Sequence, residues 1–280
     1  MIPFRLAIHS SIAFGMNIDK LIKIATEVGY TEIELSAEKL PWTNPIVSPA
    51  MKKEERKDLY LKIKKAGLKV CALAAHSSFV FFNPEERIAS LKYMHNCIEL
   101  AKDFEIPVVH FISGSCPDNI NINDAWNWLV DGLSDLIEHC KITVCLPGFE
   151  AVVNQLIATS DDLTKLVANF NNQLGIVYDP SHFQLYGEDL VSIIKKFKNK
   201  IIHVHLKDAK GKPEDFSFPP LGQGDILFEK VFESLKEINY NRAFSVEYEG
   251  NYFGNYSIPI DEIISQGYDF CSKLYKKIRS

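Results

Sequence analysis

The sequence lacks the features that would mark a disulfide-bonded, membrane or secreted protein. Its six cysteines form no C-x-x-C pair and no regular framework. No stretch approaches the roughly 18 consecutive apolar residues that a membrane-spanning helix needs. The opening segment MIPFRLAIHSSIAFG has no basic region followed by a long apolar run, so no signal peptide is expected. These absences predict a reduced, cytoplasmic chain that has no membrane partner.

Positive charge is also scarce. The 31 Lys and Arg residues are outnumbered by 36 Asp and Glu residues, which gives a formal net charge of -5. Because phosphate contacts need clustered basic side chains, we expect no nucleic-acid partner. No P-loop is present, and no G-x-G-x-x-G motif follows the first apolar run. An open doubly wound sheet is therefore the weaker of two hypotheses for the fold.

The sequence is rich in short apolar runs that alternate with amphipathic stretches. Helix signals support this pattern, because Asn17 is a candidate N-cap, Gly29 a candidate helix end, and Pro84 precedes acidic residues. Eight strand–helix units predict an α/β protein with a closed (β/α)8 TIM barrel, forming a single domain over residues 1–280. The expected strands are residues 4–10, 31–36, 69–77, 107–113, 143–150, 174–179, 201–208 and 243–249. The expected helices are residues 17–29, 51–67, 84–104, 122–140, 160–171, 189–198, 227–238 and 259–278.

Acids and histidines stand at the ends of these expected strands, where barrel enzymes carry their functional residues. Strand side chains alternate in direction, so His203 and His205 point the same way. If His205 faces the barrel mouth, Glu150, Asp179 and Glu247 share its rim. Three carboxylates and one imidazole suit one divalent cation, and burying the acids without a cation would be costly. The strand ends carry His9, Glu34, His76, His110, Glu150, Asp179, His182, His205, Asp208, Glu247 and Glu249.

Four segments in this order resemble motifs of the xylose isomerase-like superfamily of sugar epimerases and isomerases. YDPSHFQLYGED resembles its strand-six D-x-x-H motif, HVHLKDAKG its strand-seven motif, FPPLGQGDI the following Gly-x-Gly loop and FSVEYEG its strand-eight Glu. The resemblance covers about the whole chain. It implies one divalent metal ion bound by Glu150, Asp179, His205 and Glu247, with Mn²⁺ expected first and Mg²⁺, Co²⁺ or Zn²⁺ as alternatives. Glu249 shares the strand parity of Glu247 and is the alternative ligand.

The resemblance also implies that Glu150 and Glu247 form the catalytic acid/base pair. Removing a proton beside a ketone leaves an enediolate, which a metal ion stabilises as a Lewis acid while two carboxylates move protons. Proton return gives epimerisation or isomerisation, and loss of a β-hydroxyl gives dehydration. We therefore expect an isomerase acting on a small sugar or keto-polyol. A metal-dependent dehydratase and a non-catalytic sugar-binding barrel are the alternatives, and a homodimer or homotetramer is compatible with either.

Other side chains at this end are expected to contact the substrate, although strand-end hydrogen bonding or capping is an alternative for each. For Asp208 the alternative is orienting a loop or a metal ligand, and His203 is expected to be an interior structural histidine. No arginine stands near Asp208, where epimerases of the family often place one. The expected substrate contacts are His182, His9, Glu34, His76 and Asp208. Aromatic residues in the loops after the first three strands are expected to wall the pocket, namely Phe14, Trp42, Phe79, Phe81 and Phe82.

Endonuclease IV shares this fold but uses three zinc ions. Phe216 and Phe218 stand where its Asp-x-His motif belongs. His110 lies earlier in its strand than the corresponding metal histidine. The sequence therefore predicts one metal ion and no cleavage of DNA at abasic sites.

Overall fold

Parallel strands close into a barrel in the computed structural model, which describes residues 4–13, 15–40, 43, 45–254, 256 and 258–279. The barrel strands are β1 (Leu6–His9), β2 (Glu32–Ser36), β3 (Lys69–Ala74), β4 (Val108–Phe111), β5 (Leu146–Glu150), β6 (Gly175–Tyr178), β7 (Ile201–Leu206) and β10 (Phe244–Val246). Each strand pairs with the next along the chain, and β10 closes against β1. The predicted TIM barrel is confirmed, and the open doubly wound sheet is wrong.

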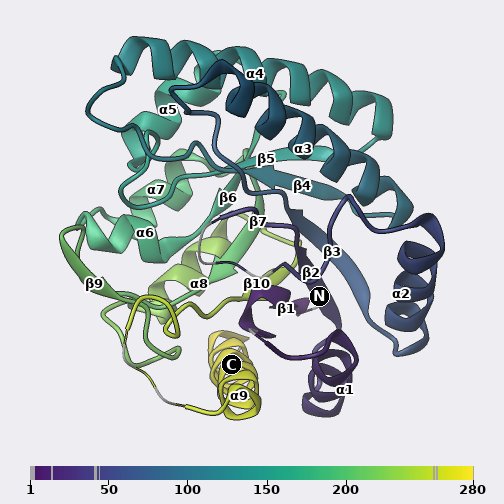
Figure 1. Ribbon diagram of the computed structural model, residues 1–280. Coiled ribbons are helices and arrows are strands. Elements are labelled where there is room, and N and C mark those ends of the chain that lie inside the picture. The colour runs from purple at the N-terminus through teal and green to yellow at the C-terminus, as the bar shows by residue number, and fades with distance from the viewer. Residues whose placement is uncertain are drawn as a thin grey trace.

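Helices surround these strands (Figure 1). They are α1 (Ile18–Val28), α2 (Lys53–Lys65), α3 (Pro84–Asp103), α4 (Ile122–Thr143), α5 (Ser160–Ala168), α6 (Pro180–Leu185), α7 (Leu190–Lys196), α8 (Phe228–Glu237) and α9 (Ile260–Arg279). A short 3₁₀ helix, η1 (Ser10–Ala13), follows β1. The first and last α-helices contact each other where the barrel closes. No helix among the described residues is long and apolar enough to cross a lipid bilayer.

Local sequence signals explain where several helices begin and end. The predicted cap Asn17 accepts a hydrogen bond from the backbone N–H of Asp19 at 2.8 Å, and Gly29 ends α1 in the left-handed conformation with φ 116°. Such an N-cap contributes about 1 kcal/mol. Helix α4 runs to Thr143 with Val144 as its C-cap, so β5 begins at Leu146 and not at residue 143, where the strand was predicted to start.

Two elements on the open side of the barrel were not predicted. Helix α6 begins directly after β6, with Asp179 as its N-cap and Pro180 in its first turn. The strands β8 (Lys210–Lys212) and β9 (Asp215–Ser217) form an antiparallel hairpin after β7. Both elements follow strands that carry predicted site residues, so they shape the entrance to the site.

The barrel interior changes from apolar to polar toward the carboxyl ends of its strands. A cluster of small apolar residues that includes Ala7 and Val108 lies apart from the main core. Two residues further along the same strands, and on the same strand face, are the buried His9 and His110. Barrel interiors are normally filled by branched apolar side chains. A layer of buried histidines therefore needs a chemical explanation.

Candidate active site

The structure brings together the four side chains that the sequence predicts as metal ligands. Glu150 ends β5, Asp179 and Glu247 follow β6 and β10, and His205 lies within β7. One ligand atom from each lies within 4.8 Å of the others, and all four residues are buried. His205 Nδ1 is 3.1 Å from Glu150 Oε1 and 3.2 Å from Glu247 Oε2. The grouping predicted from strand ends is thus present in the fold.

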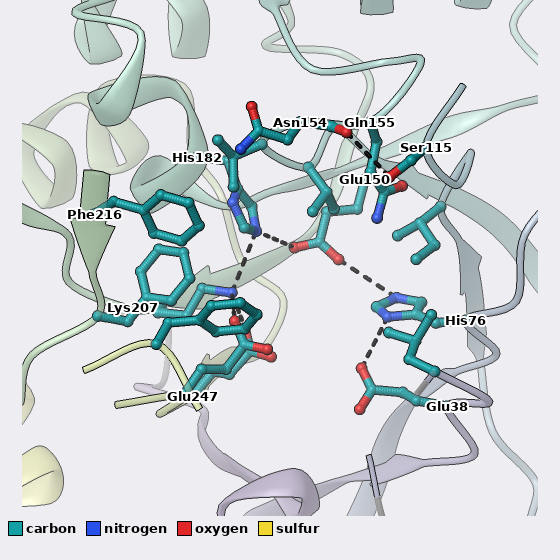
Figure 2. Close-up of a pocket in the computed structure, with 17 residues that line it drawn as sticks. Glu38, His76, Ser115, Glu150, Asn154, Gln155, His182, Lys207, Phe216 and Glu247 are labelled. Atoms are coloured by element: carbon teal, nitrogen blue, oxygen red, sulfur yellow. Dashed lines mark hydrogen bonds and ion pairs between the residues drawn. The ribbon is translucent and has the colours of Figure 1, made fainter. Parts of the chain in front are cut away.

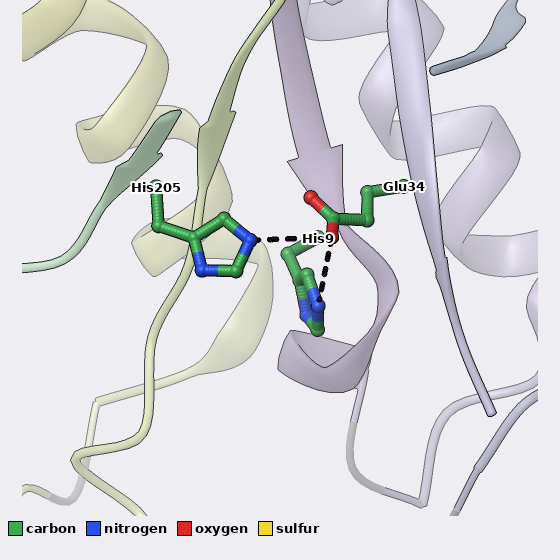
Figure 3. A group of neighbouring side chains, drawn as sticks. All are labelled: His9, Glu34 and His205. Atoms are coloured by element: carbon green, nitrogen blue, oxygen red, sulfur yellow. Dashed lines mark hydrogen bonds and ion pairs between the residues drawn. The ribbon is translucent and has the colours of Figure 1, made fainter. Parts of the chain in front are cut away.

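This donor set fits a divalent cation. Ligand atoms held at about 2.1 Å from an ion lie about 3 Å from one another. Asp179 Oδ1 accepts the backbone N–H of Ser181, but its buried Oδ2 accepts no hydrogen bond from the described residues, although Lys207 Nζ lies 3.0 Å away. His205 turns its second nitrogen, Nε2, toward Glu34 Oε1 at 3.2 Å (Figure 3). A carboxylate on the far nitrogen is the usual support of a metal-binding imidazole.

Lys207 is a site residue that the sequence analysis missed. Its side chain is only 2% exposed, and Nζ lies 3.0 Å from Asp179 Oδ2, 3.1 Å from Glu247 Oε2 and 2.8 Å from Glu249 Oε2. Burial alone would lower the pKa of Lys207, but these carboxylates outweigh burial and hold the pKa well above its ordinary value. The signal was present, because Lys207 follows His205 by two positions and shares its strand face.

Glu249, the alternative metal ligand, has a different partner. Its Oε2 accepts a hydrogen bond from Lys207 Nζ. Glu249 does not belong to the cluster of described side chains formed by Glu150, Asp179, His205 and Glu247. Burial raises the pKa of Glu249 to about 7, against the opposing charge of Lys207. The position of Glu247 within the cluster favours Glu247 as the ligand.

A pocket opens above the cluster, with a cavity of about 180 Å³. This volume is below the range of about 300–1,000 Å³ that is typical of drug-sized ligands, so it suits a small molecule. Glu150 lies at its centre, between Phe216 on one side and His76 with Glu38 on the other (Figure 2). Other side chains that line it include Ser115, Asn154, Gln155, His182, Lys207, Phe218, Glu247, Glu249 and Phe253.

Two of the five predicted substrate contacts, His76 and His182, line this pocket. His182 Nε2 lies 3.5 Å from Asp179 Oδ2 and 3.3 Å from Lys207 Nζ. Burial and the charge of Lys207 lower the pKa of His182 to about 4, so the imidazole is neutral at pH 7. Its buried Nδ1 has no hydrogen-bond partner among the described residues.

His9 and Glu34, also predicted to contact substrate, lie below the pocket and do not line it. Glu34 accepts hydrogen bonds at 2.6 Å from both His110 Nε2 and His203 Nε2, and His9 Nε2 lies 3.6 Å from Glu34 Oε1. Figure 3 shows the Glu34 carboxylate between His9 and His205. The geometry therefore makes Glu34 a support for the interior histidines. The structural role predicted for His203 agrees with its contact to Glu34.

His110 is placed closer to the site than the sequence argument assumed. Its Nδ1 lies 3.0 Å from His76 Nε2, and ligand atoms of His76, His110 and Glu150 lie within 4.8 Å of one another. The sequence argument placed His110 earlier in its strand than the metal histidine of endonuclease IV, yet in the fold His110 lies beside His76 and Glu150. His76 Nδ1 pairs with Glu38 Oε1 at 2.8 Å, and His76 Nε2 is 3.4 Å from Glu150 Oε2. Glu38 and the histidines thus fix the orientation of Glu150.

The aromatic wall of the pocket comes from a different part of the chain than predicted. Phe216, Phe218 and Phe253 line the pocket, and their ring centroids are 5.2–5.6 Å apart. By contrast, Phe79 is buried in the core and Phe82 is 71% exposed. Neither these two nor Phe81 is among the described lining residues, while Phe14 and Trp42 lie outside the described residues.

Asp208, the remaining predicted substrate contact, instead fixes the loop after β9. Its Oδ2 accepts the backbone N–H groups of Gly222 and Gly224 at 2.9 and 3.0 Å, and its Oδ1 accepts those of Ala209 and Ile226. A Cβ atom on Gly224 would lie 2.2 Å from Asp208 Oδ1, so the loop needs glycine there. Asp208 is not among the described residues that line the pocket, and of the two predicted roles the structure favours orientation of the loop.

Replacing Asp208 with alanine is expected to lower the free energy of unfolding by about 2–3 kcal/mol, because several backbone N–H groups lose their acceptor together. Urea denaturation of the two proteins measures this difference. The matched control is Asp225→Ala in the same loop, whose exposed side chain predicts a change within about 0.5 kcal/mol. Equal losses in the two variants would contradict the role of Asp208.

Known proteins resemble this chain in both sequence and structure. A family model described as "Xylose isomerase-like TIM barrel" matches residues 22–274. An inosose dehydratase of Clostridium perfringens is 29% identical over 142 residues, which cover 45% of this chain and 48% of that protein. The L-ribulose-5-phosphate 3-epimerase UlaE of Escherichia coli is 24% identical over 238 residues, which cover 81% and 80% of the two chains. The chain thus spans about half the length of the inosose dehydratase it matches.

A crystal structure of the IOLI protein "with a binding zinc atom" superposes with a TM-score of 0.79 at 21% sequence identity, covering 98% of this chain and 99% of that one. At this identity the likeness concerns the fold. It agrees with the closed barrel.

Proposed function

The chain belongs to the xylose isomerase-like TIM barrel family, and from that premise we propose that it is a divalent-metal-dependent sugar or keto-polyol isomerase. The reaction we propose is epimerisation or isomerisation by proton transfer beside a carbonyl group. The observation that carries this proposal is the convergence of Glu150, Asp179, His205 and Glu247 at the floor of an open pocket. The family's sugar epimerases and inosose dehydratases, represented among the relatives, support the same class of chemistry.

These four side chains would hold the cation, for which we propose Mn²⁺, with Mg²⁺, Co²⁺ or Zn²⁺ as alternatives. Zinc is the ion named for the IOLI protein. When bound, such an ion supplies a Lewis acid that stabilises negative charge developing on the substrate carbonyl oxygen. The buried Asp179 Oδ2, which accepts no hydrogen bond from the described residues, supports a cation at this position.

Glu150 is the proposed base. Its Oε1 faces His205 in the cluster, whereas Oε2 faces His76 at the pocket wall. One oxygen is thus placed for the cation and the other is held at the pocket by His76. Because Glu38 fixes the far side of that imidazole, the position of Glu150 Oε2 is set before substrate arrives. A preorganised carboxylate removes a proton without first reorienting.

Glu247 is the proposed partner that returns the proton. It follows a different strand from Glu150 and also lines the pocket. Its Oε2 contacts both His205 and Lys207, and its Oε1 lies 3.9 Å from His9 Nδ1. Two carboxylates on separate strands can reach the substrate from different directions, which is the requirement for inverting one carbon.

A dehydratase is the second candidate, favoured by the inosose dehydratases among the relatives. Lys207 and His182 lie 3.3 Å apart beside Glu247 and form a cluster that could protonate a leaving hydroxyl group. Loss of water would then follow the same proton removal by Glu150. The two reactions share the first step and differ in their product.

Hydrogen exchange tests the proposal. The protein is stripped of metal, reloaded with Mn²⁺ and incubated in D₂O with a panel of ketoses and inososes. We expect exchange of the hydrogen next to the carbonyl, seen by proton NMR, only after reloading. An epimer or isomer as product supports the isomerase, whereas an enone or deoxy product supports the dehydratase. A protein that binds no metal and exchanges no compound of the panel would instead support a non-catalytic sugar-binding barrel.

A further inference from the structure

We propose that the pocket selects an uncharged, unphosphorylated polyhydroxy ketone and rejects the corresponding phosphate esters. This inference rests on the proposed function and concerns only the charge of the substrate. Lys207 is the only lysine or arginine among the described residues that line the pocket. The acidic residues that line it are Glu38, Glu150, Glu247 and Glu249.

The single ammonium group is already neutralised by the protein. Lys207 Nζ lies between 2.8 and 3.1 Å from carboxylate oxygens of Asp179, Glu247 and Glu249. Any positive charge on His76 is likewise held between Glu38 and Glu150. Both cationic side chains of the described lining are thus already paired with carboxylates of the protein. A phosphate dianion would therefore find no unpaired cationic side chain among them.

Two backbone N–H groups in a loop that commonly binds phosphate in barrels are occupied here. Barrel enzymes often hold a phosphate in the loops after their seventh and eighth strands. In this chain the seventh barrel strand is β7, and the β8–β9 hairpin and a loop follow it. The N–H groups of Gly222 and Gly224 in that loop donate to Asp208 Oδ2 at 2.9 and 3.0 Å. Because Asp208 is an acid, it occupies these two N–H donors and also repels an anion.

The remaining walls suit a neutral polyol. Glu38, which is 5% exposed, offers carboxylate oxygens that can accept hydroxyl hydrogens, as Oε2 already does from Ser36 at 2.9 Å. Opposite it, Phe216 and its neighbouring aromatic rings present an apolar surface (Figure 2). The C–H face of a sugar ring can cover such rings, whereas a phosphate placed there would lose its water without gaining a partner.

The test compares Mn²⁺-loaded enzyme on neutral ketoses and on their terminal phosphate esters, using D₂O exchange and kcat/KM. We expect kcat/KM for the best neutral ketose to exceed that of its ester by at least tenfold. A preference for the ester would overturn this inference and leave the proposed function intact. Exchange with neither kind of compound would instead count against the proposed function.

A variant at the pocket mouth tests whether charge causes the preference for neutral ketoses over phosphate esters. Ser115 is exposed at the pocket mouth, where its hydroxyl donates to Asn154 O at 3.1 Å. Ser115→Arg adds a guanidinium group there and is expected to raise the ratio of ester to ketose kcat/KM at least tenfold, with the gain lost at high salt. Ser115→Gln adds similar length without charge and is expected to leave this ratio unchanged. Equal shifts in both variants, or none in Ser115→Arg, would overturn the electrostatic explanation.

Discussion

Glu150→Gln is expected to abolish exchange of the substrate α-hydrogen with D₂O, lowering the rate by about a thousandfold or more. The amide cannot accept the proton, and general acid–base catalysis contributes about 10²–10⁴-fold. The amide is nearly isosteric, so the packing around β5 is retained. Proton NMR of the Mn²⁺-loaded variant with the best substrate measures the loss.

The matched control is Glu38→Gln, which alters a second buried pocket carboxylate that binds His76. Because Glu38 acts on Glu150 only through that imidazole, we expect a smaller loss, about tenfold. Thermal melting and metal content show whether each variant is folded and loaded. Full activity in folded, metal-loaded Glu150→Gln would contradict the assignment of Glu150 as the base.

Glu247→Gln and Glu249→Gln are expected to differ sharply in metal content. Glu247 belongs to the cluster around His205, whereas Glu249 is paired with Lys207. We expect the Glu247 variant to lose its metal ion on dialysis together with its turnover, and the Glu249 variant to keep the ion. Elemental analysis after dialysis measures the bound metal per chain.

Thermal stability measures metal binding by the Glu247→Gln and Glu249→Gln variants independently. A ligand at about 100 times its dissociation constant stabilises a folded protein by about 2.7 kcal/mol. Added Mn²⁺ should therefore raise the melting temperature of wild type and Glu249→Gln but leave Glu247→Gln unchanged. The reverse pattern would make Glu249 the ligand, as its shared strand parity allows.

Much of the fold was predictable because the barrel repeats one local pattern. Apolar runs, caps such as Asn17 and breakers such as Gly29 act over a few residues, so they are readable in sequence. The hairpin β8–β9 was missed because its two strands are only 3 residues each and mostly exposed or half-buried. Such strands carry no apolar alternation. Helix α6 was missed because its sequence PSHFQL, just 6 residues, is too short to show a helical period.

The predicted grouping of side chains agrees with the structure where position along a strand is sufficient, and differs from it where depth in the barrel matters. Glu150, Asp179 and Glu247 all stand at the ends of their predicted strands. The sequence therefore grouped them, because the carboxyl ends of parallel strands meet at one end of a barrel. The same reasoning predicted that Glu34 and His9 line the pocket, although they lie beneath it. Strand tilt and stagger decide which layer each residue occupies, and no local pattern records them.

The sequence by itself determined the alternation of strands and helices, the order of its motifs and the strand ends that carry acids and histidines. These depend on interactions between near neighbours, or on the direction of a side chain from its own strand. Only the tertiary structure decided that Lys207 joins three carboxylates, that Asp208 binds a loop, and that Phe216, Phe218 and Phe253 wall the pocket. Those contacts join strands and loops whose relative heights are set by closure of the whole barrel.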